Sequence, residues 1–457
     1  MTTLRRALGR WDLTAIGVNQ VIGGAIFLWP AQVAAQVGAW SPIGFILIGL
    51  LSLAVALCFA ELSSRFDATG GPYLFTRAAF GEFAGFEVGW MQWFSRASSQ
   101  ASIMAATAVA LGYYFGALTA GWPRAAFLIA LTVAFAAINV RGVRHGALVV
   151  NVLTIAKLAP LAVFIIVGLA FVQTPRLTTL PPITVHQALA AGLLLIFVYG
   201  GYETVPIPAG EAVEPRRDVP FAIVATIVVV AMVMTLVQIV AQGVLADVAG
   251  HATPIADAAA AFLGATGALL IGVGSVVSMT GNNAGQVLNG SRSLYALAEA
   301  RQLPDWFARL HPRFRTPVNA IVFQSGVALT LALSGSFAAI AVVSALARLL
   351  MYAGSAAATL KLRSRSGVGD VKEATFTAPL GPAAPIVALC VCVALAAGAT
   401  REQLFGGFAA LVAGACLYFV TRRRRSREGG RSQREKSTAV VLPPQTTMPT
   451  RSPRRGT

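Results

Sequence analysis

Residues 18–30 read VNQVIGGAIFLWP, and residues 197–211 read FVYGGYETVPIPAGE. Each stretch places two adjacent glycines, Gly23–Gly24 and Gly200–Gly201, in the middle of a long apolar segment. Inside a lipid bilayer every backbone amide and carbonyl needs a partner, so a helix interruption is tolerated only where protein or a water-filled cavity lines it. The two stretches therefore predict an internal site in a helical membrane protein.

The composition excludes an ordinary soluble enzyme. Of 457 residues, 56% are hydrophobic and 12% are charged, whereas a soluble domain carries roughly 25% charged residues. The net charge of +17 comes largely from the Arg-rich segment after residue 421, and the remainder is spread between apolar runs. This spread is typical of a membrane protein. It does not fit a nucleic-acid partner, because a protein that binds nucleic acid gathers its basic residues on one face.

Twelve apolar stretches are long enough to cross the membrane, which takes about 20 residues of helix. Their approximate limits are 13–37, 42–64, 83–118, 124–140, 147–172, 187–211, 219–245, 263–298, 318–334, 336–360, 384–400 and 402–421. The third and eighth are long, so we expect them to tilt or to project from the bilayer. The segment PYLFTRAAFGE, residues 72–82, is too short to span and predicts a helix at the membrane interface.

The positions of Lys and Arg predict the orientation. With the N terminus inside, most of the 35 Lys and Arg lie on the cytoplasmic side, and the opposite loops carry Arg124, Arg176 and Arg401. Cytoplasmic loops of membrane proteins are rich in these residues. We therefore predict a multi-pass protein of the cell (cytoplasmic) membrane with both termini, including the N-terminal segment 1–12, in the cytoplasm.

The tail, residues 422–457, has too few apolar residues for a core and is predicted to be disordered. Its basic start, RRRRSR, has two interpretations: a cluster that stops translocation, or a contact with anionic lipid head groups.

The twelve spans divide into two sets of five and a final pair. Residues 13–172 and 187–360 form the two sets, which enter the membrane from opposite sides, and residues 384–421 hold two peripheral helices. The glycine pairs fall at corresponding positions, in the first helix of each set. Paired breaks in inverted halves indicate a midplane substrate site in a secondary transporter. The alternative is that the glycines allow close helix packing.

The physics of the breaks suggests the ligand. Unwinding near Ile22, Gly23, Gly24 and Ala25 exposes amides at the start of a half-helix, which favour a carboxylate. Unwinding over 197–201 exposes carbonyls at the end of a half-helix, which favour an ammonium group. An amino acid, with both groups on one carbon, fits between them.

Two ionisable groups lie beside the breaks. Lys157 is near the midplane of the fifth span, where a charge is costly and usually functional. It has two interpretations: a proton carrier, or a fixed cation bonded to carbonyls of the first break. Glu203, beside the second break, has three: a partner of Lys157, a proton-binding group, or a helix cap.

Other polar and aromatic groups near the site stay ambiguous. The three aromatic residues Phe197, Tyr199 and Tyr202 have two interpretations. One of their rings closes over a bound ligand as a gate, or all three pack in the core. Within the spans, Arg96 and Arg348 line a water-filled path or brace helices. Asn282 and Asn283 line the cavity or join helices.

Motifs for other chemistry are absent from the sequence. There is no P-loop, no G-x-S-x-G and no H-E-x-x-H, so we expect no enzyme, catalytic residue, metal or cofactor. Any uphill movement of substrate then draws on an ion gradient or on exchange.

Four stretches together resemble one known family: IGGAIFLWPA (22–31), FAELSSRFDATGGPYLFTRAAFGEFAGFEVGW (59–90), YGGYETVPIPAGEAVEPRRDVPFAI (199–223) and SRSLYALAEARQLPDWFARLHPRFRTPVNAI (291–321). The chain is similar to bacterial amino-acid permeases of the amino acid, polyamine and organocation transporter (APC) superfamily. The resemblance implies an all-α LeuT-like fold, with a ten-helix inverted-repeat core over 13–360, discontinuous first and sixth helices, and two peripheral helices.

The resemblance also implies roles for particular residues. Gly23, Gly24 and Ala25 match the segment that cradles the substrate carboxylate, and Phe197 matches the gating aromatic. Gly200 lies where a carbonyl takes the substrate ammonium. Lys157 matches the lysine that replaces a sodium ion in proton-coupled and some facilitative relatives. Two departures stand out: Gly-Gly-Ala replaces the common Gly-x-Gly, and the run 206–208, Pro-Ile-Pro, is unusual.

The sequence thus predicts a permease that couples amino acid uptake to protons. Exchange of an amino acid for another or for its amine is the first alternative, and a non-transporting membrane sensor is the second. The expected partners are a small amino acid substrate, protons and membrane lipids.

Overall fold

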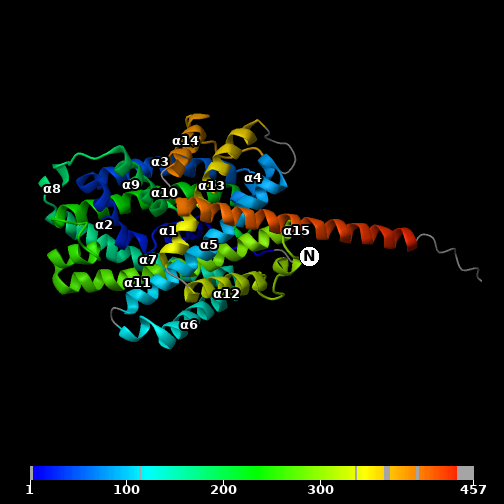
Figure 1. Ribbon diagram of the computed structural model, residues 1–457, viewed down its shortest axis with the longest axis horizontal. Coiled ribbons are helices and arrows are strands. Elements are labelled where there is room, and N and C mark those ends of the chain that lie inside the picture. Colours follow the sequence, from blue (N-terminus) through cyan, green and yellow to red (C-terminus); the bar gives the residue numbers. More distant parts are fainter. Residues whose placement is uncertain (1–3, 113–114, 335–336, 365–370, 398–400, 440–457) are drawn as a thin grey trace, which may run out of the picture.

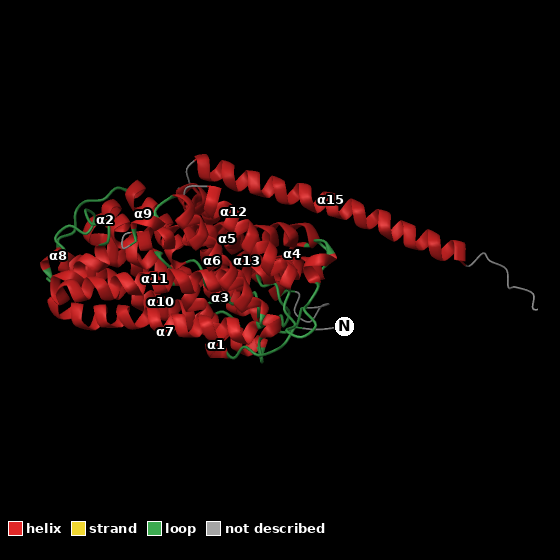
Figure 2. Ribbon diagram, turned by 90° about the horizontal axis from the view of Figure 1, so that it is seen from below, coloured by secondary structure: helices red, strands yellow, loops and turns green. Residues whose placement is uncertain are grey.

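The computed structural model describes residues 4–439, except 113–114, 335–336, 365–370 and 398–400. These residues form helices joined by turns, and the described part of the chain contains no strand (Figures 1 and 2). One isolated parallel bridge pairs Leu8 with Ala212. The all-helical class expected from the sequence is therefore confirmed.

The fifteen α-helices of this part of the chain run in the order α1 (Arg10–Val21), α2 (Ala25–Val37), α3 (Ser41–Ser63), α4 (Pro72–Phe80), α5 (Glu82–Gly112), α6 (Gly121–Val140), α7 (Val143–Gly168), α8 (Pro175–Thr178), α9 (Val185–Tyr199), α10 (Pro215–Val244), α11 (Pro254–Glu299), α12 (Val318–Ser334), α13 (Phe337–Arg363), α14 (Ala383–Ala397) and α15 (Arg401–Ala439).

Six helical segments of the described residues are long and apolar enough to cross a membrane: Trp29–Ser63, Gly121–Val140, Gly146–Phe171, Pro215–Val244, Pro254–Glu299 and Leu404–Arg422. Three shorter apolar helices are Val185–Ile196, Val318–Ser334 and Ala383–Ala394. Several crossings make the chain a multi-pass membrane protein. The expected number of twelve crossings stays a prediction. One segment, Trp29–Ser63, joins α2 to α3, and several other apolar helices are shorter than a full crossing.

The two spans expected to be long differ at their ends. α11 begins at Pro254 and bends at Gly264, whose φ of 63° and ψ of −155° are non-helical. The expected segment 263–298 therefore corresponds to the part of α11 that follows this bend. α5 ends at Gly112 rather than at residue 118.

The interfacial segment forms the short helix α4. It is bounded by Gly71 with a φ of 55° and Gly81 with a φ of 94°, values that side-chain-bearing residues rarely adopt. Figure 1 shows α4 at the end of the molecule where the N terminus lies.

The last helix extends further than the sequence predicted. We expected no ordered structure from Arg422 onward, but α15 continues to Ala439. Arg, Lys, Glu and Gln are good helix formers, so an apolar helix that has already nucleated continues through them. Figure 2 shows α15 projecting beyond the helical body. The rest of the expected tail, residues 440–457, lies outside the described residues.

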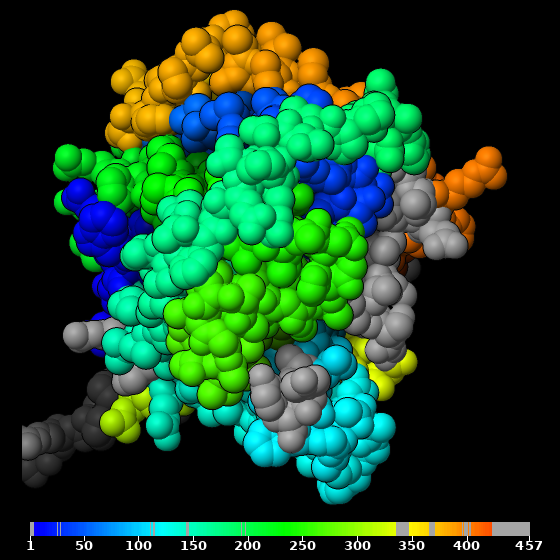
Figure 3. All heavy atoms as spheres, turned by 90° about the vertical axis from the view of Figure 1, so that its left-hand side faces the viewer, coloured from blue at the N-terminus to red at the C-terminus, as the bar shows by residue number. Residues whose placement is uncertain are grey.

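The first two helices occupy the middle of the bundle. α1 packs against α7, α10 and α11, and α2 packs against α9 and α11. The end of the molecule opposite the N terminus carries α8 and the start of α11, which cover the middle of that face in Figure 3. The gap between α1 and α2 therefore lies inside the protein, where an interrupted helix is tolerated.

Candidate functional site

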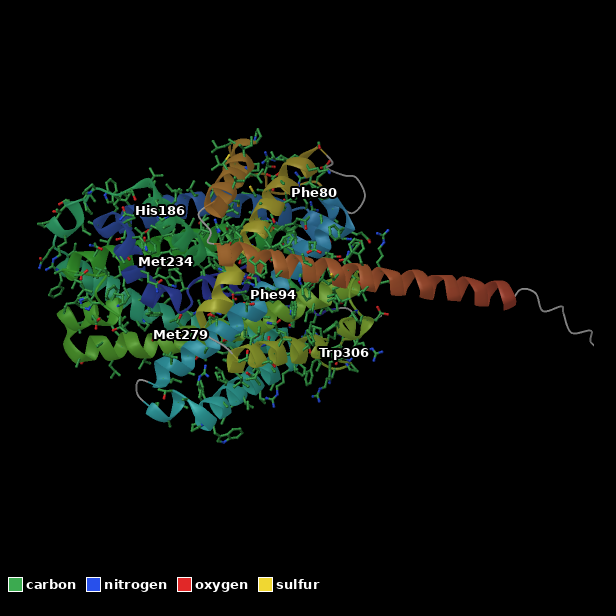
Figure 4. All side chains as sticks on the ribbon, in the orientation of Figure 1. Phe80, Phe94, His186, Met234, Met279 and Trp306 are labelled. Carbon is green, nitrogen blue, oxygen red and sulfur yellow. The ribbon has the colours of Figure 1, made fainter. Side chains whose placement is uncertain are left out.

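The first break separates α1 from α2 over residues 22–24. Ile22 leaves the helical region with a ψ of 80°. A Cβ on Gly23 would lie 2.9 Å from Asn282 Nδ2, and one on Gly24 would lie 3.1 Å from Met279 Cε. Both glycines thus allow α11 to approach closely. Figure 4 shows Met279 within the body, away from Phe80 and Trp306, which lie toward the end from which α15 projects.

Lys157, on α7, binds the carbonyls that the break releases. Its Nζ donates to Ile22 O at 2.6 Å, to Asn19 O at 3.2 Å and to Ser278 O at 3.2 Å. The side chain is fully buried. The contacts with carbonyls of the first break are those of the second interpretation of Lys157, and its role in proton coupling stays a prediction.

α11 completes the set of partners around the same break. Ser278 Oγ donates to Ile22 O at 3.1 Å and to Gly23 O at 3.0 Å. Asn282 Nδ2 donates to Asn19 O and Gln20 O. In return, Asn19 Nδ2 donates to Gly281 O at 2.7 Å. The end of α1 is therefore anchored to α11 through hydrogen bonds in both directions.

The two asparagines of α11 have different roles. Asn282 joins α11 to α1, as described above, whereas Asn283 Nδ2 donates to Met279 O within its own helix. Of the two interpretations that the sequence left open, joining helices fits Asn282.

The second break is wider than expected. The span predicted over 187–211 ends as an α-helix at Tyr199, and two 3-10 turns, η4 (Tyr202–Thr204) and η5 (Ala209–Glu211), follow it. No inner half-helix forms before α10 begins at Pro215. Pro206 and Pro208 lack amide hydrogens, and each disfavours a helical conformation in the residue before it, which explains the irregular backbone.

The two breaks touch each other through their backbones. Gly201 has a φ of 143°, and a Cβ there would lie 2.7 Å from both Gln20 C and Val21 N. Any larger residue would separate α1 from the second break. The second break therefore lies against the end of α1, directly before the first break.

Glu203 pairs with arginines rather than with Lys157. Arg96 Nη2 on α5 lies 2.9 Å from Glu203 Oε1, and Arg348 Nε on α13 lies 3.7 Å from the same oxygen. The other oxygen, Oε2, accepts from the Tyr352 hydroxyl at 2.9 Å and from Gly201 N at 2.6 Å. Glu203 thus fixes the second break, and the expected possibility of a Glu203–Lys157 pair does not occur here.

The predicted aromatic groups pack in different places. Tyr199 is buried and its hydroxyl donates to Phe45 O at 2.8 Å. Tyr202 stacks on Tyr352 at 5.6 Å between ring centroids. Both fit the packing interpretation, and the Tyr202 ring does not lie free as a gate would. The side chain of Phe197 lies outside the described residues.

A second buried ion pair holds the segment after the break. Arg292 on α11 makes a bidentate pair with Glu211, with both N–O distances at 2.9 Å. The Glu211 carbonyl also accepts from Ala7 N and Leu8 N. This contact joins the N-terminal segment to the turn that follows the second break.

The sequence missed several of these partners. Ser278, Tyr352 and Arg292 carried no signal beyond being polar groups in apolar segments. Arg96 and Arg348 were noted as intramembrane charges, but nothing in a single sequence showed that they share one carboxylate.

The site offers opposite polarities to a small ligand. The first amides of α2 have no partner within the helix, and the helix dipole adds partial positive charge there. The last carbonyls of α9 likewise have no hydrogen-bond partner within their own helix. A helical membrane protein with two facing helix interruptions has the architecture of a secondary transporter.

Comparison with known proteins gives the family. The amino acid permease family model matches residues 8–420, and the chain belongs to that family. A serine/threonine exchanger, SteT of Bacillus subtilis, is 29% identical over 84% of this chain and 89% of its own. The branched-chain amino acid permease BcaP of the same organism is 24% identical over 93% of this chain and 95% of its own. A methylthioribose transporter of B. subtilis is 27% identical over 86% of this chain and 88% of its own. The chain is therefore a transporter, and nothing in the family indicates an enzyme.

Proposed function

We propose that this chain carries amino acids across the cytoplasmic membrane by alternating access, in a twelve-helix LeuT-like arrangement with both termini in the cytoplasm. The observation that supports this most is the contact between the two breaks, with Gly201 against Gln20 and Val21. One small molecule placed there meets both helix ends at once. A shift of either helix would then change the site and its access together.

The substrate carboxylate is assigned to the amides of Gly23, Gly24 and Ala25, at the positive end of α2. In this structure the Gly23 amide donates to Val21 O at 2.9 Å, so it has to release that bond to take part. The ammonium group is assigned to the last carbonyls of α9, with Phe197 as the candidate gate. Arg348 lies against Gly200, since a Cβ at Gly200 would clash with its Nη1. The ammonium therefore belongs on carbonyls before Gly200.

Proton-coupled symport is the mode that we propose. Lys157 Nζ has three carbonyl acceptors within 3.2 Å, and an ammonium group has three hydrogens to donate, whereas a neutral amine has two. This conformation therefore suits the protonated lysine. A conformation that separates α7 from the break would favour loss of the proton, which links protonation to the access state.

Exchange is a second candidate because one relative is named a serine/threonine exchanger. The two modes differ in what they need on the far side of the membrane. A symporter fills empty vesicles when a proton gradient is imposed. An exchanger requires a counter-substrate inside.

The test is uptake of each of the twenty labelled amino acids into liposomes that contain the purified protein. Concentrative uptake into empty liposomes under an inward proton gradient is the expected result. Uptake that needs a preloaded amino acid would replace symport by exchange. Binding without flux in either setting would favour a sensor, and neither binding nor flux of any amino acid would overturn the proposed function.

A further inference from the structure

Arg96, Glu203 and Arg348 form a buried charge cluster at the second break. Arg96 and Glu203 are each 1% exposed and Arg348 is 6% exposed. The two guanidinium groups come from different helices, α5 and α13, and both face the same carboxylate oxygen. Tyr352 adds a hydroxyl, which is neutral.

Counted over the charged groups that the structure describes, this cluster carries one positive charge more than the carboxylate of Glu203 neutralises. Arginine stays protonated in proteins, so two guanidinium groups share a single carboxylate. Two other buried glutamates of the described chain are held elsewhere: Glu61 by Arg65 and Arg363, and Glu211 by Arg292. The carboxylate oxygens of Glu87, nine residues before Arg96 on α5, are buried without a hydrogen-bond partner among the described residues. An uncompensated charge in a protein interior is costly unless an opposite charge is brought to it.

Hydrogen-bonding capacity is left over as well. Arg96 uses Nη2 for Glu203 and Ser95, whereas its Nε and Nη1 have no hydrogen-bond partner within the described part of the molecule. These two nitrogens are buried away from bulk solvent.

The cluster directly adjoins the site for the substrate. Arg348 lies against Gly200, and Glu203 accepts from the amide of Gly201, which itself touches α1. A substrate bound between the breaks by its amino and carboxyl groups would therefore extend its side chain close to Arg348. Of the two arginines, Arg348 is the more exposed.

We propose that the substrate carries a second anionic group, as an acidic amino acid does, and that Arg348 binds it. Arg96 acts as a positioning residue that holds Glu203 against the break. The inference rests on the proposed function, because it names the substrate class of the same site. A neutral substrate would leave the excess charge uncompensated, whereas a side-chain carboxylate offsets it.

Binding of two isosteric pairs, glutamate with glutamine and aspartate with asparagine, tests this in the full chain in lipid nanodiscs. Within each pair, the two differ in charge and barely in shape. We expect the acid to bind at least about tenfold more tightly than its amide, the effect of about one charge-assisted hydrogen bond. Arg348→Gln should reduce that ratio to near one.

Two further variants make the test decisive. Arg348→Lys keeps the charge and should retain a preference for the acid. Arg124→Gln removes an arginine from α6, which carries no break residue, and should leave the ratio unchanged. Size-exclusion profiles identify a variant that fails to fold. If Arg348→Gln does not fold, the ratio of acid binding to amide binding in the wild-type chain and in Arg348→Lys still tests the acidic substrate.

The outcomes separate the two proposals. Equal binding of acid and amide, or binding of other amino acids with none of these four, would overturn the acidic substrate and leave amino acid transport standing. An acid preference that survives Arg348→Gln would overturn the role of Arg348. Absence of binding by all twenty amino acids would instead contradict the proposed function.

Discussion

Gly201 has a backbone conformation and a neighbour that both exclude a side chain. Its φ is 143°, and its missing Cβ would lie 2.7 Å from the backbone of α1. Gly201→Ala must therefore strain the second break and push it from the first. We expect loss of substrate binding and a melting temperature lowered by several degrees, corresponding to about 1–3 kcal/mol of backbone strain.

A matched glycine provides the control. Gly326 lies on an exposed face of α12, and a Cβ there would meet nothing within 4 Å. Gly326→Ala should leave binding unchanged and stabilise the helix by roughly 0.5–1 kcal/mol. If Gly201→Ala bound substrate as tightly as Gly326→Ala, the contact between breaks would have no part in binding.

Lys157→Ala tests the coupling of transport to protons. The variant removes the ammonium group that donates to the carbonyls of Asn19, Ile22 and Ser278. We expect proton-driven uptake to fall at least about tenfold, while binding measured in nanodiscs is retained. Uptake with and without an imposed proton gradient gives the measurement. Lys361→Ala, on α13 at the ring of Phe80, is the control, and unchanged proton-driven uptake in Lys157→Ala would refute the role.

At this scale the sequence predicted positions better than partners. The glycine pairs and Lys157 were visible because small residues and a lysine stand out in apolar segments. The partner of Glu203 could not be predicted, because Arg96 is 107 residues away in sequence. Only the packing of α5 against the second break brings the two residues together. The alternatives for Lys157 and Glu203 could be separated only by distances.

Among the elements, the segment between α9 and α10 departs most from the predicted helix. Apolar content placed a continuous span over 187–211, but Pro206 and Pro208 prevent a regular helix, and the chain forms two 3-10 turns instead. The unusual Pro-Ile-Pro run was the available signal. It indicated a disturbed half-helix without specifying the replacement, because the final path depends on Glu203, Glu211 and their arginines.

The pair Arg292–Glu211 should be essential to that segment. Both side chains are almost fully buried and the contact is bidentate. Arg292→Gln leaves a buried carboxylate without its partner, and we expect a loss of about 3–5 kcal/mol of stability. The double variant Arg292→Gln with Glu211→Gln should recover part of that loss. Thermal unfolding in detergent, monitored by tryptophan fluorescence, measures both.

An exposed pair on the same segment gives the comparison. Arg217 and Glu214 are 76% and 57% exposed, so Arg217→Gln should change stability by less than about 1 kcal/mol. If Arg217→Gln and Arg292→Gln lowered the free energy of unfolding equally, burial would not determine how much these ion pairs contribute to stability.

For the whole molecule, the sequence indicated a helical membrane protein from composition and charge distribution, and a transporter from the paired glycine breaks and the family resemblance. The family match agrees with it. Helix ends were harder to predict, because apolar content does not reveal where Gly264 bends α11 or how far α15 continues. Both features depend on local backbone geometry and helix propensity rather than on hydrophobicity. The number of crossings and the inverted repeat remain predictions.

Alternating access requires the end of the molecule near the N terminus to open. In this structure the N-terminal segment is held at that end against the segment after the second break, because Leu8 bridges Ala212 and both residues are fully buried. Neighbouring segments paired in this way lie about 4.7–4.9 Å apart, within the range of Cα distances that a disulfide spans. We expect Leu8→Cys with Ala212→Cys, in a chain whose four native cysteines are replaced by serine, to lose transport on oxidation and to regain it on reduction.

The measurement is uptake before and after a mild oxidant, with cross-linking quantified by mass spectrometry. Leu8→Cys alone, treated in the same way, should keep its activity because it has no partner with which to form the bond. The expected block follows from geometry: the segment after the second break moves away from the N-terminal residues if the substrate is to leave on that side. Full transport in fully cross-linked protein would mean that this end stays shut throughout the cycle, and alternating access through it would have to be abandoned.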